Sequence, residues 1–394
     1  MENPYRPGAG HRPPYLAGRT NETEGFINLL EQTVILQNLV LTGLRGIGKT
    51  VLLENFKPIA TEKKWLWAGT DWSESASVNE ASMATRILTD IALITSGLKV
   101  TEIPVREIGF DVHKHVLDVH LDFNTLSALY ENTPGLVSDK LKKVFEIVWE
   151  HLNTAGVQGI VFAYDEAQTL SDHAEEHQYP FSILLDVFQS TQKKAIPFML
   201  VLTGLPTLLT KLIECRTYTE RFFKVTVLEK LNNEESRKAI LKPLENQQMK
   251  FSEESIQQII KESGGYPYFI QFMCKETFDI FTQQSRIGEK LSMPMDAIIR
   301  KLDNDFFAGR WAKVTERERD LMILIAKMGC QEFNVRDVVA YSKSGMFKAF
   351  TRSHISQMFS RLISSGLIYK NRKGIYSFAV PLLEKYILRI TNSS

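Results

Sequence analysis

An eight-residue glycine-rich segment constrains this chain more than any other feature of its sequence. Gly43-Leu-Arg-Gly-Ile-Gly-Lys49-Thr50 satisfies the pattern G-x-x-x-x-G-K-[ST] without exception. It stands between an apolar run at residues 38–42, which predicts a strand, and a segment from residue 49 to about 60, which predicts a helix. A strand, a glycine-rich turn and a helix in this order predict the opening unit of a nucleotide-binding α/β fold.

Phosphate binding requires these residue types. Glycines let successive backbone N–H groups point at an anion, and the start of the following helix adds partial positive charge. We expect Lys49 to reach the β- and γ-phosphates and the Thr50 hydroxyl to ligate magnesium. The alternative, a chance glycine-rich turn before a helix, is disfavoured by the full agreement in this context. The predicted nucleotide-binding residues of the loop are Gly43, Leu44, Arg45, Gly46, Ile47, Gly48, Lys49 and Thr50.

A second segment supplies the acidic groups that such a site needs. Residues 159–164 form an apolar run that predicts a buried parallel strand, and Asp165 and Glu166 follow at its C-terminal end. We expect Asp165 to hold the magnesium ion, and Glu166 to orient and deprotonate the water that attacks the γ-phosphate. The alternative is two solvated acids in a loop, which the position after a buried strand disfavours.

Strand-length and helix-length segments alternate through the first half of the chain. Apolar runs at residues 65–68, 198–203 and 222–227 join the two strands above, with helix-compatible stretches between them. This alternation predicts an α/β fold with a parallel sheet covered on both faces. Residues 101–123 interrupt the pattern with spaced valines and predict a two-stranded insertion. Beyond about residue 228, polar-apolar helices dominate.

These motifs together resemble P-loop AAA+ ATPases, specifically the origin-recognition-like and STAND-like branch. Gly18 and Arg19, in Ala17-Gly-Arg followed by two glutamates, are similar to the family's Gly-Arg box, which lies near the adenine. Residues 198–204 resemble the strand that ends in the family's sensor-1 residue. The resemblance implies that the Thr203 hydroxyl lies between the acidic pair and the γ-phosphate.

The resemblance also assigns residues to the end of the core and to the lid. Arg221, and Arg216 before it, are at positions where the family carries an arginine that stabilises transition-state charge. Solvated arginines beside a strand are the alternative. Gly264-Gly-Tyr-Pro267 is similar to the G-x-P lid signature of STAND switches, in which the proline lies near the adenine. It stands where many AAA+ proteins place a sensor-2 arginine, which favours a slow, conformationally gated ATPase.

The resemblance covers nearly the whole chain and implies its division into domains. The expected fold is α/β, with a P-loop AAA+ core around a five-stranded parallel sheet, a helical lid and a C-terminal winged helix-turn-helix. The expected parts are listed here with their residues: an N-terminal arm with the Gly-Arg box at 1–35, the ATPase core at 36–228, the lid at 229–311 and the winged helix at 312–394. Prolines in the first 15 residues predict an extended arm.

Charge is distributed unevenly along the chain. The net charge is +1, but residues 312–394 carry 14 Lys and Arg against 6 Asp and Glu, which leaves residues 1–311 with a net charge of −7. Three helical segments and a basic-tipped hairpin in this region resemble a winged helix, whose third helix fits the DNA major groove. A protein-binding or autoinhibitory module is the alternative. The expected DNA-contacting residues are Arg352, His354, Arg361, Lys370, Arg372 and Lys373.

The leading hypothesis is therefore a Mg²⁺-dependent AAA+ switch that binds and hydrolyses ATP and engages double-stranded DNA through the winged helix. The alternative is a STAND-like signalling or defence ATPase whose winged helix contacts protein partners. Either reading implies ATP and ADP as ligands and a homo-oligomer in the ATP state. No apolar run reaches the length of a membrane span, and the three cysteines lie far apart, so we expect a cytoplasmic protein without a membrane segment.

Overall fold

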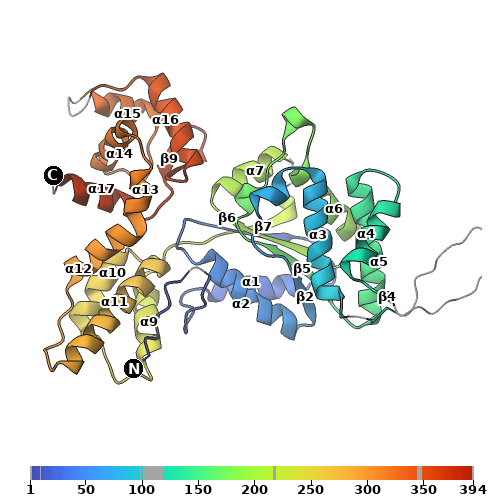
Figure 1. Cartoon of the computed structure of the whole chain (residues 1–394), viewed down its shortest axis with the longest axis horizontal. Coiled ribbons are helices and arrows are strands. Elements are labelled where there is room, and N and C mark those ends of the chain that lie inside the picture. The colour runs from blue at the N-terminus through green and yellow to red at the C-terminus, as the bar shows by residue number, and fades with distance from the viewer. Residues whose placement is uncertain are drawn as a thin grey trace, which may run out of the picture. The chain divides into compact units, whose positions relative to one another are not determined.

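The computed structural model describes residues 2–8, 10–97, 99–100, 119–215, 219–343 and 348–392 (Figure 1). The chain forms two compact units, which are described separately. The sheet unit consists of Asn21–Thr42 and Leu52–Val227. The helical unit consists of Met1–Thr20, Gly43–Val51 and Leu228–Ser394.

The sheet unit is built on five parallel strands in the order β2-β5-β6-β1-β7. The strands β1, β5 and β6 are buried at every position because helices cover both sides of the sheet, whereas the edge strand β7 has exposed residues. Along the ladders Leu41 pairs with Thr203, and Tyr164 pairs with Leu202. The C-terminal ends of β1, β5 and β6 therefore share one edge of the sheet. The strands are β1 (Asn38–Thr42), β2 (Trp65–Ala68), β5 (Gly159–Tyr164), β6 (Phe198–Gly204) and β7 (Phe223–Val227).

Helices pack on both faces of this sheet. In Figure 1, α1 (Thr20–Leu30) and α2 (Lys49–Glu62) lie on one side, where Phe26 stacks on Phe56 with ring centroids 4.2 Å apart. The opposite face is covered by α3 (Glu80–Thr95), α5 (Val137–Thr154) and α6 (Pro180–Lys193). The other elements of the unit are 3₁₀ turns at Glu74–Ser77, Ala167–Thr169 and Ala174–Glu176, and helices α4 (Phe123–Asn132), α7 (Thr207–Cys215) and α8 (Thr219–Phe222).

The predicted insertion at residues 101–123 falls largely outside the described residues, which omit 101–118. Two short strands flank this gap: β3 (Lys99–Val100) pairs antiparallel with β4 (Val119–His120). The last residue of the predicted insertion, Phe123, is the first residue of α4. The sequence analysis does not predict this helix. Asp122 caps this helix by accepting a hydrogen bond from the Thr125 N–H at 2.8 Å.

The helical unit has a hydrophobic core of its own. One group of helices comprises α9 (Asn233–Leu241), α10 (Glu253–Ser263), α11 (Pro267–Arg286) and α12 (Met295–Leu302). From α12 the chain continues through a π-helical segment at Asp303–Ala308 into α13 (Gly309–Ala312). The C-terminal part comprises α14 (Glu316–Met328), α15 (Val335–Ser342), α16 (Arg352–Ser364), the hairpin of β8 (Ile368–Arg372) and β9 (Ile375–Phe378), and α17 (Leu383–Asn392). A short 3₁₀ turn at Lys242–Leu244 follows α9.

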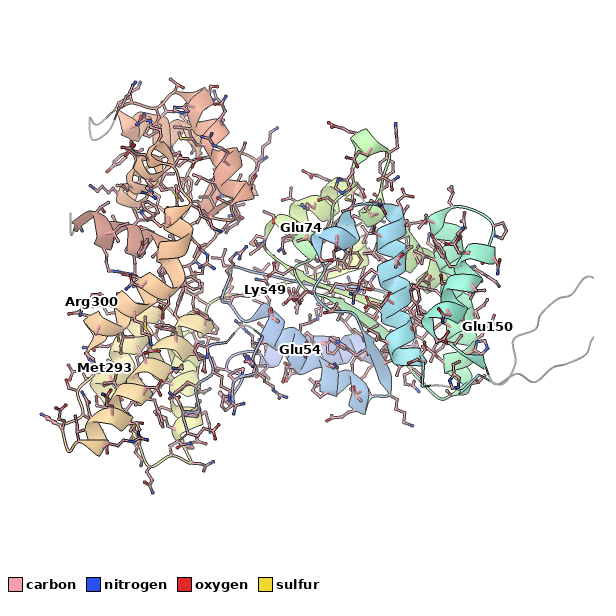
Figure 2. All side chains as sticks on the ribbon, in the orientation of Figure 1. Lys49, Glu54, Glu74, Glu150, Met293 and Arg300 are labelled. Carbon is pink, nitrogen blue, oxygen red and sulfur yellow. The ribbon has the colours of Figure 1, made fainter. Side chains whose placement is uncertain are left out.

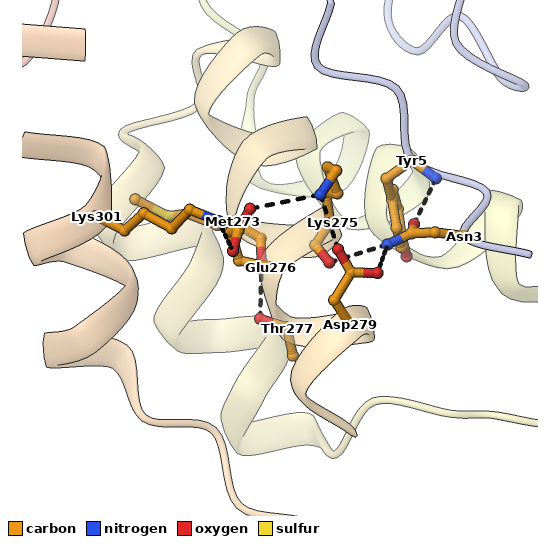
Figure 3. Close-up of polar contacts among 8 residues, drawn as sticks. All are labelled: Asn3, Tyr5, Met273, Lys275, Glu276, Thr277, Asp279 and Lys301. Carbon is orange, nitrogen blue, oxygen red and sulfur yellow. Dashed lines mark hydrogen bonds and ion pairs between the residues drawn. The ribbon is translucent and has the colours of Figure 1, made fainter. Parts of the chain in front are cut away.

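The N-terminal arm packs on this helical core (Figure 3). Residues 2–7 form neither helix nor strand, as predicted. Tyr5 is nevertheless only 2% exposed, and its hydroxyl donates to the carbonyl of Ile240 at 2.5 Å. The Asn3 amide donates to the Lys275 carbonyl at 3.0 Å and to Asp279 Oδ1 at 2.7 Å. The arm is therefore an integral part of the helical unit.

A membrane span would need a long apolar helix. Among the described residues of this chain, no helix has the length and the apolar character to cross a bilayer.

Candidate nucleotide-binding site

The phosphate loop follows β1 directly at Gly43 and leads into α2 at Lys49, as the motif predicts; Figure 2 labels Lys49 at the start of this helix. Gly46 and Gly48 have φ angles of 75° and 94°, a backbone region that residues with a Cβ rarely adopt. A Cβ at Gly43 would lie 2.9 Å from the Leu228 carbonyl oxygen, so this position also requires glycine. Positive φ angles at these glycines are conformations that let successive N–H groups of a loop converge on an anion, and the start of α2 adds partial positive charge.

The lysine of the motif lies against its own loop. Lys49 is 8% exposed, and its Nζ donates to the Gly43 carbonyl at 2.9 Å and to the Leu44 carbonyl at 3.1 Å. Its positive charge is therefore concentrated at the glycine-rich turn. These groups fit a triphosphate with Mg²⁺. The Lys49 ammonium and the backbone N–H groups can donate hydrogen bonds to phosphate oxygens, and the Thr50 hydroxyl oxygen can be a ligand of the ion.

Arg19, expected beside the adenine, makes main-chain contacts. It is 6% exposed, and its guanidinium donates to the carbonyls of Ile47 at 3.0 Å and of Glu229 at 2.9 Å. These bonds join the loop to the segment that follows β7. Arg19 therefore stabilises the backbone of the phosphate loop at Ile47. Gly18, with φ 60°, lies where a Cβ would approach Leu231 Cδ2 to 2.9 Å.

The lid signature lies next to the same loop. Pro267 is the first residue of α11, and the next residue, Tyr268, donates its backbone N–H to the Gly46 carbonyl at 3.1 Å. A Cβ at Gly46 would stand 3.1 Å from the Tyr268 Cβ, so the two backbones approach closely here. Tyr268 directly follows the lid signature, but the sequence analysis gave it no role, because this contact joins segments far apart along the chain.

Arg45, at the exposed part of the loop, reaches the C-terminal helices. A Cβ at Gly366, just after the end of α16, would lie 3.3 Å from Arg45 Nη2. A cation is favourable there because the carbonyl end of a helix carries partial negative charge.

Burial and the neighbouring Arg45 charge lower the pKa of Arg310 on α13. The Arg310 guanidinium in turn lies over the Phe306 ring, 4.3 Å from its centroid.

At the edge of the sheet, the structure brings together two of the predicted residues. The Thr203 hydroxyl at the end of β6 donates a short hydrogen bond to Asp165 Oδ1, and both residues are buried. The same oxygen accepts the backbone N–H of Glu166 at 2.8 Å. The Asp165 carbonyl also accepts the Trp72 N–H at 2.8 Å. The carboxylate is therefore held in one orientation.

Glu166 is exposed and adopts a left-handed backbone conformation with φ 51° and ψ 30°. For a residue with a side chain this conformation costs about 1 kcal/mol or more. Gln168 donates its side-chain amide to Glu166 Oε2 in a short hydrogen bond. The sequence analysis did not single out Gln168, although it stands only two residues after the predicted base.

A buried ion pair lies behind the acidic strand. Asp90 on α3 is 1% exposed and accepts the Arg86 Nε–H at 3.0 Å. Burial raises the pKa of Asp90, and the Arg86 partner opposes this shift. Burial and the Asp90 charge also raise the pKa of Tyr164, which immediately precedes Asp165. These groups support the strand that carries the acidic pair.

The remaining predicted residues occupy several different settings. Arg221 is exposed on α8, just before β7, whereas Arg216 lies outside the described residues. In the C-terminal part, Arg361 pairs with Glu318 at 2.8 Å, and Arg372 pairs with Glu332 at 2.9 Å. The other expected DNA contacts are His354, which is half-buried, and Arg352, Lys370 and Lys373, which are exposed.

The sheet order, the loop after β1 and the acidic residues after β5 define the fold of the P-loop AAA+ ATPases. The chain is similar to the Walker-type ATPase PABY2304 of Pyrococcus abyssi, with 14% identity, a TM-score of 0.59, and 96% of this chain and 97% of that chain covered. It is also similar to the ORC2 protein of Aeropyrum pernix. The ADP form has 16% identity and a TM-score of 0.57, with 98% and 96% covered. The ADPNP–ADP complexes have 14% identity and a TM-score of 0.54, with 98% of each chain covered.

Sequence comparison adds one match. A family model described as a domain of unknown function, DUF8462, matches residues 304–387, which run from the π-helical segment into α17. No curated protein matches the sequence.

Proposed function

We propose that this chain is a Mg²⁺-dependent molecular switch that binds and hydrolyses ATP and couples its nucleotide state to double-stranded DNA. One observation carries the proposal. The phosphate loop follows β1, and the hydrogen-bonded Asp165 and Thr203 lie at the ends of β5 and β6, on the same edge of one parallel sheet. Nucleotides bind at this edge in open α/β sheets.

Each residue of this set has a chemical role. Lys49 and the loop N–H groups bind the β- and γ-phosphates, and Thr50 and Asp165 would hold the magnesium ion. The ion would neutralise phosphate charge when bound. Glu166 orients the attacking water and accepts its proton, and Thr203 holds the Asp165 carboxylate. Arg221 serves as the candidate arginine finger in an oligomer. Gly18, Arg19 and Pro267 are proposed to lie near the adenine of the nucleotide.

The helical unit supports a switch more than a fast motor. Within this unit, the phosphate loop bonds to the start of α11 through Gly46 and Tyr268, and it approaches the end of α16 through Arg45. A change in the loop on nucleotide binding would therefore act on the lid and on the C-terminal helices together. We propose the domain division 1–35, 36–228, 229–311 and 312–394 as the units of this switch.

DNA engagement is proposed for the part with the charge excess. Residues 312–394 carry a net charge of +8, and α14, α15 and α16 are followed by the β8–β9 hairpin in the order of a winged helix. Arg352 and His354 lie in the first turn of α16, whose N-terminal residues would contact base edges. Lys370 and Lys373 lie at the hairpin and would contact phosphates.

Mutation of the loop and of the acidic pair tests the enzymatic part of the proposal. Lys49→Ala should abolish ATP binding, measured by equilibrium titration with a fluorescent ATP analogue. Glu166→Gln should bind the analogue with unchanged affinity while turnover, measured as phosphate release, falls about 10²-fold or more. Equal ATP binding by wild-type protein and Lys49→Ala would refute the proposed site. Equal turnover by Glu166→Gln would refute the base role alone.

A second candidate function is a STAND-like scaffold that assembles on ATP and contacts protein partners. The pairing of Arg361 with Glu318 and of Arg372 with Glu332 favours it, because two of the expected DNA contacts are already neutralised. Light scattering with ADP or with a non-hydrolysable ATP analogue, with and without duplex DNA, distinguishes the two. ATP-dependent oligomers that ignore DNA would favour the scaffold, and a salt-sensitive DNA complex would favour the switch.

A further inference from the structure

Gln168 connects the candidate base to the end of a neighbouring strand. Its side-chain nitrogen donates to Glu166 Oε2, and its side-chain oxygen accepts the Leu205 backbone N–H at 3.0 Å. Leu205 directly follows β6, the strand that carries Thr203. One amide therefore joins the Glu166 carboxylate to the strand whose hydroxyl holds Asp165.

The surroundings of Gln168 hold this amide in place. Lys211 on α7 donates its ammonium to the Gln168 carbonyl at 2.5 Å, to the Leu170 carbonyl at 3.1 Å and to Ser171 Oγ at 2.7 Å. This ammonium fixes the backbone of the turn that follows Glu166. At Gly204 a Cβ would stand 2.6 Å from Gln168 Oε1, so an added Cβ would force the amide out of its present position.

The conformation of Glu166 makes such a support necessary. Its backbone is left-handed, its side chain is exposed, and the carboxylate of a solvated glutamate samples several rotamers. A general base acts only when it stays within hydrogen-bond reach of the water proton that it removes. A fixed donor two residues away limits the carboxylate to one position.

We propose that Gln168 is the positioning residue for Glu166. It holds the carboxylate of the base against the end of β6, so that Glu166, Asp165 and Thr203 form one fixed set. The inference rests on the proposed ATP hydrolysis, in which Glu166 is the base. Gln168 itself does not contact the nucleotide in this scheme, so it affects turnover and leaves nucleotide affinity unchanged.

Two substitutions at Gln168 separate its two hydrogen bonds. Gln168→Ala removes both bonds. Gln168→Glu keeps an acceptor for the Leu205 N–H and places a second carboxylate beside Glu166. We expect each to lower kcat about 10- to 100-fold, with KM and the affinity for a fluorescent ATP analogue within about 2-fold of wild type. Unchanged or increased kcat in either variant, or parallel loss of nucleotide affinity, would overturn the proposal.

A matched control is available on the lid. Gln257 on α10 is exposed and donates its amide to Glu253 Oε1 at 2.9 Å, the same kind of bond between glutamine and glutamate. Gln257→Ala should leave kcat and KM within about 2-fold of wild type. An equal loss of kcat in this control would show that the Gln168 effect is not specific to the base, and would overturn the proposal.

A double-mutant cycle then tests whether Gln168 acts through Glu166. In a Glu166→Gln background, Gln168→Ala should cause no further loss of the residual kcat. Multiplying losses would overturn the positioning role while leaving the base role of Glu166 intact. If Glu166→Gln alone retains wild-type turnover, the base role of Glu166 fails, whereas the proposed hydrolytic function fails if the wild-type protein releases no phosphate from ATP, so these failures are distinguishable from a failure of the positioning role.

Gly204→Ala provides an independent route to the same effect if Gln168→Ala proves unstable. The added Cβ displaces the Gln168 amide and changes no atom of Gln168 or Glu166. We expect its kcat to fall as in Gln168→Ala, with circular dichroism and thermal melting used to confirm folding. In the folded protein, wild-type kcat with Gly204→Ala would contradict the positioning role.

Discussion

At the scale of single residues, burial controls the reactivity of Cys215 on α7. Burial, together with the nearby negative charge of Asp172, raises the pKa of this thiol from 9.0 to about 12. Because the folded-state pKa is raised, the neutral thiol is favoured in the folded protein. Its contribution to stability is present below pH 9 and is lost only as the pH rises toward 12.

We therefore predict slow alkylation of Cys215 in the folded protein. At pH 8 its thiolate fraction is about 1,000-fold lower than that of a thiol with the ordinary pKa, and the thiolate is the reacting species. Cys330, which is exposed, serves as the internal reference. Iodoacetamide labelling followed by peptide mass spectrometry should show Cys330 modified first, with the Cys215 rate rising about tenfold per pH unit above pH 8. Equal rates at pH 8 would contradict the assigned shift.

At the scale of elements, the N-terminal arm caps a helix of the helical unit. Helix α9 ends at Leu241, so the carbonyl of Ile240 belongs to the last turn and has no partner within the helix. The Tyr5 hydroxyl supplies that partner at 2.5 Å, while its ring packs against Phe251 and Phe278. The arm thus satisfies a buried polar group and fills apolar space in the same place.

We predict that Tyr5→Phe destabilises α9 by about 1–3 kcal/mol, since it leaves the Ile240 carbonyl buried without a donor. Tyr5→Ala should cost about 3–5 kcal/mol because it also removes the ring. Amide hydrogen exchange in α9 and α11 measures both effects locally. Tyr179→Phe, at an exposed tyrosine, is the control and should change exchange little. Unchanged protection in Tyr5→Ala would show that the arm does not stabilise α9 and α11.

At the scale of the whole molecule, acidic partners reduce the field of the basic C-terminal part. Glu332 accepts hydrogen bonds from Asn371 and Arg372 at the hairpin, and Glu318 pairs with Arg361. The net charge of +8 already counts these acids, but Arg361 and Arg372, which are paired with them, are less available to phosphates than unpaired basic side chains.

If the proposed DNA contact is correct, Glu332→Gln should strengthen it by freeing Arg372 for a phosphate. We predict tighter binding to a duplex at low salt and a slope of log K against log salt steeper by about 1. Arg352→Ala should weaken binding, and Glu289→Gln, at an exposed glutamate before α12, is a control of equal charge change. Fluorescence anisotropy over a salt series measures all three. Identical slopes for Glu332→Gln and wild type would exclude Arg372 from the contact.

Local rules explain what could be predicted from the sequence. The apolar runs of β5 and β6 and the glycines of residues 43–48 each encode their conformation within a few residues, and parallel strand ends meet at one edge. The shared edge of β5 and β6 was therefore predictable, whereas the contact between Asp165 and Thr203 was implied by the family resemblance. Gln168 was not predictable, because no local motif distinguishes it from other polar surface residues. Helix α4 was also missed, although Asp122 caps it and Leu126 and Tyr130 are buried one turn apart.

The sequence by itself determined that the chain has a phosphate loop, an acidic strand end and a parallel sheet, because backbone dihedrals and hydrophobic periodicity are local properties. Only the tertiary structure decided which partners the charged and polar side chains take. It placed Arg19 on the Ile47 carbonyl of the loop, Arg361 on Glu318 and the Gln168 amide between Glu166 and Leu205. Such pairings join residues whose proximity depends on how the elements pack, which a spacing pattern along the chain does not record.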